Sequence, residues 1–214
     1  MSIQEHKNHI DKVLENTFAV IRFLYQNKHF EGNANCSSSA AGSRLIFPKK
    51  HSGIRVSEQE LRFVFQEQLY AYINNLEQNG QQWDVYYSVE TPTENKYSLS
   101  GNGERSANID LVLYAAGVRI ALIEFKALNP GEYEHMKDTF KLRNEPGESL
   151  RYFVEIVSSR NNGTFSSIEG KLSQKDYEKQ NFTVSESNDK KFTYVICCLA
   201  DSDIQKDKII YQEM

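Results

Sequence analysis

The sequence predicts an α/β fold in which a central mixed sheet of about four to five strands is flanked by helices, with an N-terminal helical extension. Residues 108–128 contain two runs rich in Ile, Leu and Val, separated by a short turn. Residues 57–80 have the apolar spacing of an amphipathic helix. Residues 192–199, FTYVICCL, form another apolar run of strand length. Strand-like and helix-like segments thus follow one another along the chain, which is typical of the α/β class.

Composition indicates a cytoplasmic protein without a membrane span. The 214 residues carry a formal net charge of −4, and no apolar run approaches the roughly 18 residues that cross a bilayer. The N-terminus lacks the apolar region of a signal peptide, and Cys36, Cys197 and Cys198 are too few for a disulfide framework. The acidic balance argues against broad, tight coating of nucleic acid, although a local basic stripe would still contact phosphates.

Two regions are expected, residues 1–43 and residues 44–214. The apolar spacing of residues 3–30 predicts an amphipathic helix. Residues 31–43, EGNANCSSSAAGS, are a loop by composition and are expected to be mobile. The helix has two interpretations, because it would either cap the core domain or pair with a second copy in a homodimer.

The segment 108–128 places three charged side chains in apolar strands. With a turn centred near Gly117, Asp110 falls opposite residue 123 or 124, so its carboxylate neighbours that of Glu124. Glu124 and Lys126 point to the same face because strand side chains alternate. Buried charges are costly unless they are paired or hold a metal. The simpler alternative is a strand end that emerges into water, with Glu124 and Lys126 as a solvated pair.

This pattern resembles the PD-(D/E)xK nuclease superfamily. The motif reads Ile109-Asp110, then thirteen residues, then Glu124-Phe125-Lys126. Ile109 replaces the proline that often precedes the first acid in that superfamily. The resemblance implies a restriction-endonuclease-like three-layer core with the element order α-β-β-β-α-β, and hydrolysis of phosphodiester bonds by a metal-dependent nuclease.

The rest of the nuclease-like domain, residues 44–214, is expected to supply the other core elements. Residues 83–90 predict a strand that ends at a proline, and residues 131–148 predict the helix that this core requires after the Glu-x-Lys strand. Residues 149–158, SLRYFVEIVS, suit a helix or a strand, and the helix is favoured. The strand at 192–199 would then complete the core.

The helix at 57–80 supplies one further acid. Ser57 and Glu60 fit a capping box, S-x-x-E. At about 100° per residue, Glu58 lies within the apolar stripe and Glu60 on the opposite side. In the superfamily the first core helix often adds an acid to the metal site, and geometry carries that role to Glu58. The alternative is that Glu58 only favours the helix N-terminus through the dipole.

These groups suit a hard divalent cation. The carboxylates of Asp110, Glu124 and Glu58, with the backbone carbonyl of Phe125, are oxygen ligands of the kind that Mg²⁺ or Mn²⁺ prefers. Such an ion polarises a phosphate and lowers the pKa of bound water. Lys126 would orient that water or stabilise charge on the phosphate, because nearby carboxylates favour its ammonium form.

Three functional readings follow. The first is a metal-dependent nuclease that acts on nucleic acid, with DNA as the expected substrate. The second is an inactive nuclease-like fold that binds nucleic acid or protein, and the third is an unrelated α/β protein with a chance motif. For the first reading, the expected nucleic-acid contacts are basic side chains near the motif: Arg55, Arg62, Arg105, Lys137 and Lys141.

Overall fold

A computed structural model describes residues 1–33, 37–51, 53–99, 103–158, 164–173, 177–200 and 210–214. The helices and strands are, in chain order, α1 (Ile3–Gln26), α2 (Ser38–Ala41), β1 (Lys49–Lys50), β2 (Gly53–Ile54), α3 (Glu58–Gln78), β3 (Tyr86–Ser98), β4 (Arg105–Ala115), β5 (Val118–Ala127), α4 (Glu132–Asn144), β6 (Leu150–Val157), α5 (Thr164–Leu172), a 3₁₀ helix η1 (Tyr177–Gln180), β7 (Thr183–Val184), β8 (Thr193–Cys198) and β9 (Ile210–Glu213).

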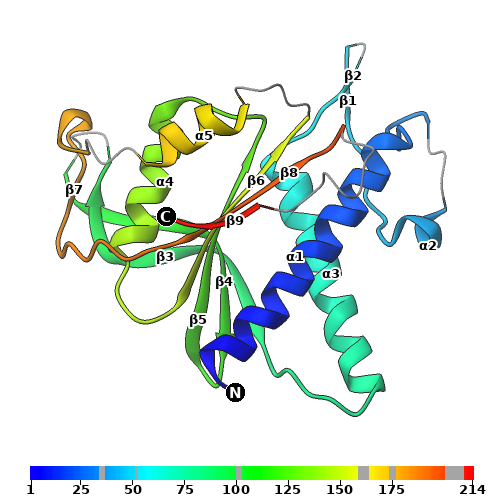
Figure 1. Cartoon of the computed structure of the whole chain (residues 1–214), viewed down its shortest axis with the longest axis horizontal. Coiled ribbons are helices and arrows are strands. Elements are labelled where there is room, and N and C mark those ends of the chain that lie inside the picture. The colour runs from blue at the N-terminus through cyan, green and yellow to red at the C-terminus, as the bar shows by residue number, and fades with distance from the viewer. Residues whose placement is uncertain (34–36, 52, 100–102, 159–163, 174–176, 201–209) are drawn as a thin grey trace.

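The fold is α/β, as the sequence predicts, and it is built on one mixed sheet (Figure 1). Over the described residues the strand order is β7-β3-β4-β5-β6-β8-β9, so the sheet has seven strands and is larger than expected. Strands β3, β4 and β5 form an antiparallel meander, whereas β5–β6 and β6–β8 are parallel. A parallel pair needs a crossover, and α4 provides it between β5 and β6.

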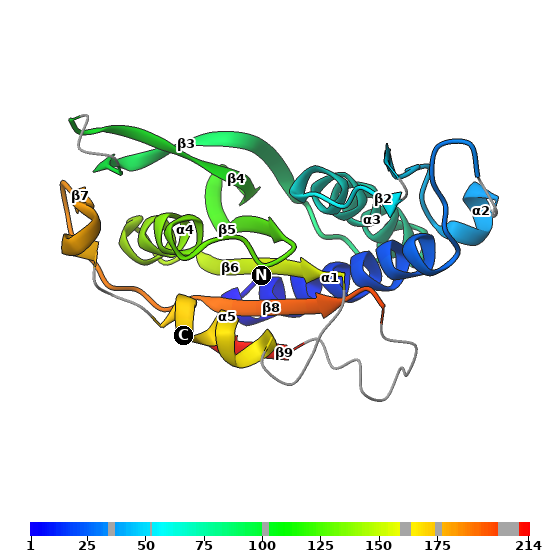
Figure 2. The same ribbon diagram turned by 90° about the horizontal axis from the view of Figure 1, so that it is seen from above.

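Helices cover both faces of the sheet. Helices α1 and α3 pack together on one face, and α4 and α5 lie on the other (Figures 1 and 2). Strand β5 serves both layers because its side chains alternate: Ile123 and Phe125 belong to the core under α1 and α3, whereas Leu122 belongs to the core under α4 and α5. Among the described helices, none is long and apolar enough to cross a membrane.

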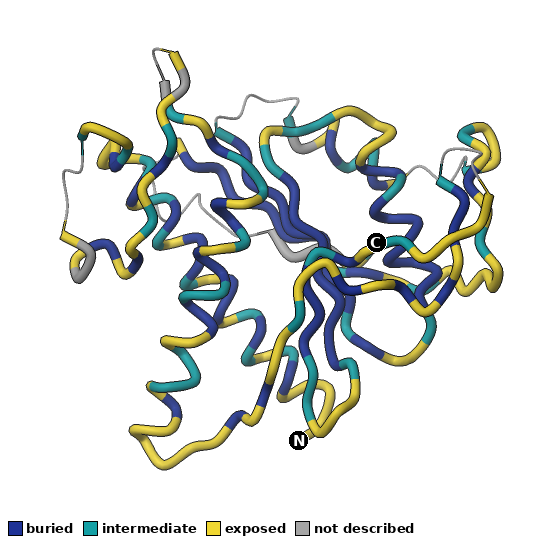
Figure 3. The backbone as a smooth tube through the Cα atoms, turned by 180° about the vertical axis from the view of Figure 1, so that it is seen from behind, coloured by how far each residue is buried: buried dark blue, intermediate teal, exposed yellow. Residues whose placement is uncertain are grey.

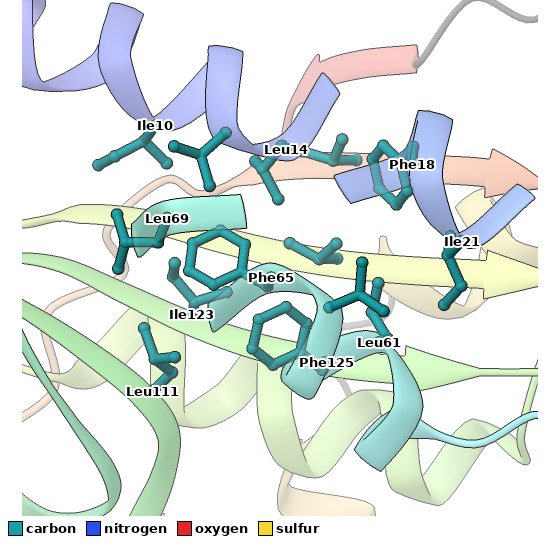
Figure 4. Close-up of a cluster of buried hydrophobic side chains, with 14 of the residues drawn as sticks. Ile10, Leu14, Phe18, Ile21, Leu61, Phe65, Leu69, Leu111, Ile123 and Phe125 are labelled. Atoms are coloured by element: carbon teal, nitrogen blue, oxygen red, sulfur yellow. The ribbon is translucent and has the colours of Figure 1, made fainter. Parts of the chain in front are cut away.

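Helix α1 is part of the main core. Its residues Ile10, Leu14 and Phe18 are buried in the same cluster as Phe65 of α3 and Phe125 of β5 (Figure 4). The two phenyl rings pack with their centroids 5.6 Å apart. The hydrophobic core therefore does not divide at residue 43. Of the loop expected to be mobile, residues 34–36 lie outside the described part of the chain.

Two elements differ from the sequence-based expectation. The prediction that favoured a helix at 149–158 is wrong, because this segment is strand β6. The strand lies between β5 and β8 and is buried along nearly its whole length (Figure 3). A strand buried on both faces has no polar alternation, so its pattern is indistinguishable from that of a buried helix. Strand β3 also continues past Pro92 to Ser98, with a register shift between Pro92 and Lys96 that accommodates the proline.

The predicted capping box at the start of α3 does not form. Ser57 is the N-cap residue, but its hydroxyl contacts the Glu60 carboxylate instead of a backbone amide. Glu60 is buried and accepts from Arg55, with 2.9 Å between Nη2 and Oε1. The prediction that Glu60 faces away from the core is therefore wrong, and the Arg55 guanidinium explains how its charge is tolerated.

Candidate functional site

The hairpin of β4 and β5 brings the two motif strands together as predicted. Ala116 and Gly117 both have positive φ, 49° and 77°, which is the geometry of a tight hairpin turn. Leu111 pairs with Ile123, which is the last pair of this register, and Asp110 and Glu124 lie immediately beyond it on the two strands. The Phe125 amide donates to Asp110 Oδ2 at 2.8 Å, which fixes the Asp110 carboxylate against β5.

Helix α4 covers the motif face of β5 with two further charges. The Lys141 Nζ lies 2.6 Å from Glu124 Oε1 and 2.9 Å from Asp138 Oδ1. The Lys126 Nζ lies 2.5 Å from Asp138 Oδ2. Glu124, Asp138 and Lys141 are 1%, 2% and 4% exposed, so this network is shielded from water. Its buried charges are paired with alternating sign, as their burial requires.

Glu58 adds a contact to this network from helix α3, whereas Asp138 and Lys141 belong to α4. It is the first residue of α3, and its Oε1 lies 3.3 Å from Lys126 Nζ. Its side chain is 44% exposed, so Glu58 marks the boundary between the buried network and solvent. The expected orientation of Glu58 toward the motif is therefore confirmed, whereas its role as a metal ligand stays a prediction.

A cavity of about 490 Å³ opens above this network. Its floor is formed by Asp110 and Lys126 of the sheet, Asp138 and Lys141 of α4, and Glu58 of α3. The outer ends of β3 and β4 and the start of α4 supply the remaining walls. Glu124 does not line the cavity; it lies beneath the residues that do.

The carboxylates of the site differ in how well they are neutralised. Burial raises the pKa of Asp110, and Asp138 raises it further. Burial also raises the pKa of Glu124 well above its ordinary value, against the attraction of Lys141 and with repulsion from Asp138 and Asp110. For Asp138, the ammonium groups of Lys141 and Lys126 overcome burial and lower the pKa to about 2. The ionised form of Asp138 is thus stabilised by its two lysine partners. For Asp110 and Glu124, the nearby ammonium groups do not fully offset the effect of burial on the pKa.

Both lysines are held as ammonium ions. Burial would lower the pKa of each, but Asp138 and Glu58 raise the pKa of Lys126, and Asp138 and Glu124 raise that of Lys141. Lys126 is therefore a donor and a positive charge at neutral pH. It is poorly suited to remove a proton from water, as the sequence-based chemistry anticipated.

The predicted nucleic-acid contacts occupy different positions. Arg105 and Lys137 line the cavity and are accessible there. Lys141 also reaches the cavity, but it is buried and its Nζ is engaged by Glu124, Asp138 and the Asn108 carbonyl. Lys141 therefore belongs to the internal network and not to a phosphate-facing surface.

Arg55 and Arg62 are both in ion pairs. Arg55 contacts Glu60 as described above, while its side chain remains half exposed. The Arg62 Nη1 lies 2.6 Å from Oε1 of Glu90, which lines the cavity. Arg62 is thus beside the cavity, but a carboxylate already holds its guanidinium.

Asp138 is the site residue that sequence reasoning missed. A usable signal was present, because Asp138 lies four residues before Leu142 and so shares a helical face with an apolar residue. A charged side chain on a face destined for burial requires a partner of opposite charge. Lys126, already identified in the motif, was the available candidate.

The fold and the site define an α/β protein with a charged cavity at one end of a mixed sheet. Comparison of the chain with protein-family models, curated proteins and solved structures finds no match.

The donor chemistry of the cavity suits a hard cation, but the ligands are not gathered in advance. Within the residues that the structure describes, no three His, Cys, Asp or Glu side chains are grouped to hold a metal ion. Burial is the main cause of the raised pKa values of Asp110, Glu58 and Glu124, and repulsion between neighbouring carboxylates adds to it. A divalent cation would supply positive charge among these carboxylates, with the half-exposed Glu58 closing onto it.

Proposed function

We propose that this protein is a metal-dependent nuclease that hydrolyses phosphodiester bonds, with DNA as the substrate. The observation that carries the proposal is the placement of Asp110 and Lys126 together at the floor of an open cavity, with the Asp110 carboxylate held by the Phe125 amide and with Glu124 buried beneath them. A phosphodiester needs an accessible cation and a positive donor at the same point, and this floor offers carboxylates for one and an ammonium for the other.

The order of elements supports the same proposal. From α3 to β6 the chain runs α3-β3-β4-β5-α4-β6, which is the α-β-β-β-α-β order of the restriction-endonuclease-like core. Strand β6 occupies the last position, which the sequence had assigned to 192–199, and β8 extends the sheet beyond it. The motif acids lie on the second and third strands of this series, where the resemblance requires them.

The residues that would hold Mg²⁺ or Mn²⁺ are Asp110, Glu58, Glu124 and the Phe125 carbonyl. When bound, the ion would polarise the scissile phosphate and acidify a water molecule. Asp110 is the best placed of these ligands because it lines the cavity and, in the described part of the chain, only the Phe125 amide is bonded to its carboxylate. Glu58 would exchange its contact with Lys126 for the cation.

Lys126 would then act as a donor. Freed from Glu58, its ammonium remains anchored to Asp138 at 2.5 Å and faces the cavity. It would orient the attacking water and stabilise negative charge that builds on the phosphate oxygens. Arg105 and Lys137, on two walls of the cavity, would contact neighbouring phosphates of the strand.

The second candidate is an inactive nuclease-like fold that binds nucleic acid or another protein. One observation favours it: Glu124 is 1% exposed, does not line the cavity and is already paired with Lys141. Because Lys141 holds one oxygen of this carboxylate, a cation would have to approach the other oxygen from beneath the residues that line the cavity. The two candidates therefore differ in whether this acid can contact an ion.

A cleavage assay separates them. Supercoiled plasmid and single-stranded RNA are incubated with chelator-treated protein, with and without Mg²⁺ or Mn²⁺, and the products are resolved on gels. We expect metal-dependent cleavage that falls by at least about 100-fold in Asp110→Asn and Lys126→Ala. The control Asp84→Asn, at an exposed position outside the cavity, should cleave like the wild type. Absence of cleavage together with absence of calorimetric metal binding would favour the binding fold.

A further inference from the structure

Lys141 differs from Lys126 in its surroundings, because three oxygen atoms from three different residues lie close to its Nζ. Its Nζ lies 2.6 Å from Glu124 Oε1 and 2.9 Å from Asp138 Oδ1, and it donates to the Asn108 carbonyl at 2.8 Å. Two carboxylates therefore form ion pairs with this ammonium, and one backbone carbonyl accepts a hydrogen bond from it. The side chain is 4% exposed, so water contributes little to its solvation.

This environment is the kind that a metal ion occupies. Two carboxylates from different elements and one backbone carbonyl converge on a single positive charge inside the protein. Oxygen atoms of these types are also the ligands of hard cations. The ammonium is tethered to α4 by its own side chain, so it cannot dissociate as a free ion would.

The overall charge of the site supports the comparison of the Lys141 ammonium with a bound metal ion. Among the described residues, four carboxylates, those of Glu58, Asp110, Glu124 and Asp138, belong to the site, and the ammonium groups of Lys126 and Lys141 oppose them. With all four carboxylates ionised, two negative charges are left over, because the other charged residues of the cavity wall cancel one another: Glu90, Glu134, Arg105 and Lys137. One divalent cation balances them, whereas two such ions would leave the site with an excess positive charge.

We infer that the Lys141 ammonium permanently fills the second cation position of this site, so that the protein binds a single divalent ion, held by Asp110. Lys141 is then a positioning residue, which fixes the Glu124 carboxylate and Asp138 without contacting the substrate. The inference deepens the proposed nuclease function and rests on it for the identity of the first ion, but the claim about Lys141 can be tested separately.

Lys126 and Lys141 would have distinct tasks. Lys126 bridges Asp138 and the half-exposed Glu58, and the longer contact of 3.3 Å to Glu58 can open toward the cavity. In the described part of the chain, the partners of the Lys141 ammonium are two buried carboxylates and a backbone carbonyl, and no exposed acid competes for it. One lysine is available to the substrate, and the other neutralises the interior.

The test is the stoichiometry of Mn²⁺ binding to the chelator-treated full chain, measured by electron paramagnetic resonance and by calorimetry. The variants are Lys141→Gln, which removes the charge, and Lys141→Arg, which keeps it. Lys12→Gln is the matched control, because Lys12 is an exposed lysine of α1 whose ion pair is with a neighbouring surface acid, Glu15. No nucleic acid is present, so activity does not enter the readout.

We expect one Mn²⁺ per chain in the wild type, in Lys141→Arg and in Lys12→Gln, and one additional Mn²⁺ in Lys141→Gln. If the wild type binds none and Lys141→Gln binds one, the nuclease proposal fails while the inference about Lys141 stands. Equal stoichiometry in Lys141→Gln and the wild type overturns the inference, as does a wild type that binds two ions. If Lys141→Gln is unfolded in chelator, Mn²⁺ should restore its circular dichroism, and failure to do so also overturns it.

Discussion

Asp138 and Glu124 are both buried and both contact Lys141. Replacing each carboxylate by an uncharged amide should nevertheless change the stability of the fold by very different amounts. Asp138 contacts two ammonium groups, at 2.5 and 2.9 Å, and its pKa is lowered to about 2. Glu124 contacts one, and burial raises its pKa well above the ordinary value. The protein therefore favours the ionised form of Asp138 and disfavours that of Glu124. We predict that, without metal, Asp138→Asn destabilises the fold far more than Glu124→Gln.

The size of the effect follows from the same contacts. Lowering the pKa of Asp138 from 3.8 to about 2 corresponds to about 2 kcal/mol of stability at neutral pH. Removing one partner from a buried ion pair costs about 3–5 kcal/mol, and Lys126 and Lys141 each keep another carboxylate, which reduces the loss. Asp138→Asn should thus cost about 2–3 kcal/mol. Glu124→Gln should cost less than about 1 kcal/mol, because the amide resembles the neutral form that the site favours.

The assay is urea unfolding in the presence of chelator, followed by the fluorescence of Trp83, the single tryptophan of the chain. The pH dependence adds a second readout. The contribution of Asp138 is present above pH 3.8 and is lost as the pH falls toward 2. The raised pKa of Glu124 acts in the opposite sense, so its ionisation removes stability as the pH rises above 4.5, and Glu124→Gln should abolish that loss. A larger destabilisation by Glu124→Gln than by Asp138→Asn at pH 7 would refute the reasoning.

Three further predictions concern the buried His6–Trp83 pair, the hydrophobic core and the metal site. His6→Leu should cost about 1–3 kcal/mol, because it removes the acceptor of the buried Trp83 indole N–H at 3.1 Å, whereas His6→Asn keeps an acceptor and should cost less in urea unfolding. Burial lowers the pKa of His6, so the stability that depends on its neutral form should be lost as the pH falls below 6.5, a loss that His6→Asn should remove. Phe65→Ala should cost about 3–5 kcal/mol by the same measurement, because the ring is fully buried against Phe125. Mg²⁺ should raise the melting temperature of the wild type in differential scanning fluorimetry, but not that of Asp110→Asn, and equal shifts in both proteins would count against Asp110 as a ligand.

The parts of the fold that could be predicted are those whose pattern is local. The turn at Gly117 and the apolar runs on either side predict the β4–β5 hairpin, and counting from the turn places Asp110 opposite residue 123 or 124. A register shift between Leu113 and Tyr114, which counting does not foresee, sets the pairing of Leu111 with Ile123 and so brings Asp110 next to Glu124. Strand β6 could not be derived in this way, because burial on both faces removes the alternation that distinguishes a strand from a helix. The burial of Glu60 was also missed, because its partner Arg55 lies before the helix, outside the helical pattern.

The partners of the motif residues follow from strand and helix geometry. Glu124 and Lys126 are two residues apart on one strand, so their Cα atoms are about 6.6 Å apart and their side chains run parallel, which hinders a direct ion pair. Each therefore needs a partner from the element that covers this face. That element is α4, which must run antiparallel to β5 because it returns the chain to the start of the parallel strand β6.

An antiparallel helix presents its charges in reverse order. Its later residue, Lys141, meets the earlier strand residue, Glu124, and its earlier residue, Asp138, meets Lys126. Neighbours three residues apart on a helix are separated by about 5–6 Å, close to the spacing of the two strand side chains. A Glu-x-Lys strand followed by a crossover helix therefore predicts an acid and, three residues later, a base on the buried face of that helix. Reversing the pair, as in Asp138→Lys with Lys141→Asp, places like charges together and should prevent folding even though the composition is unchanged.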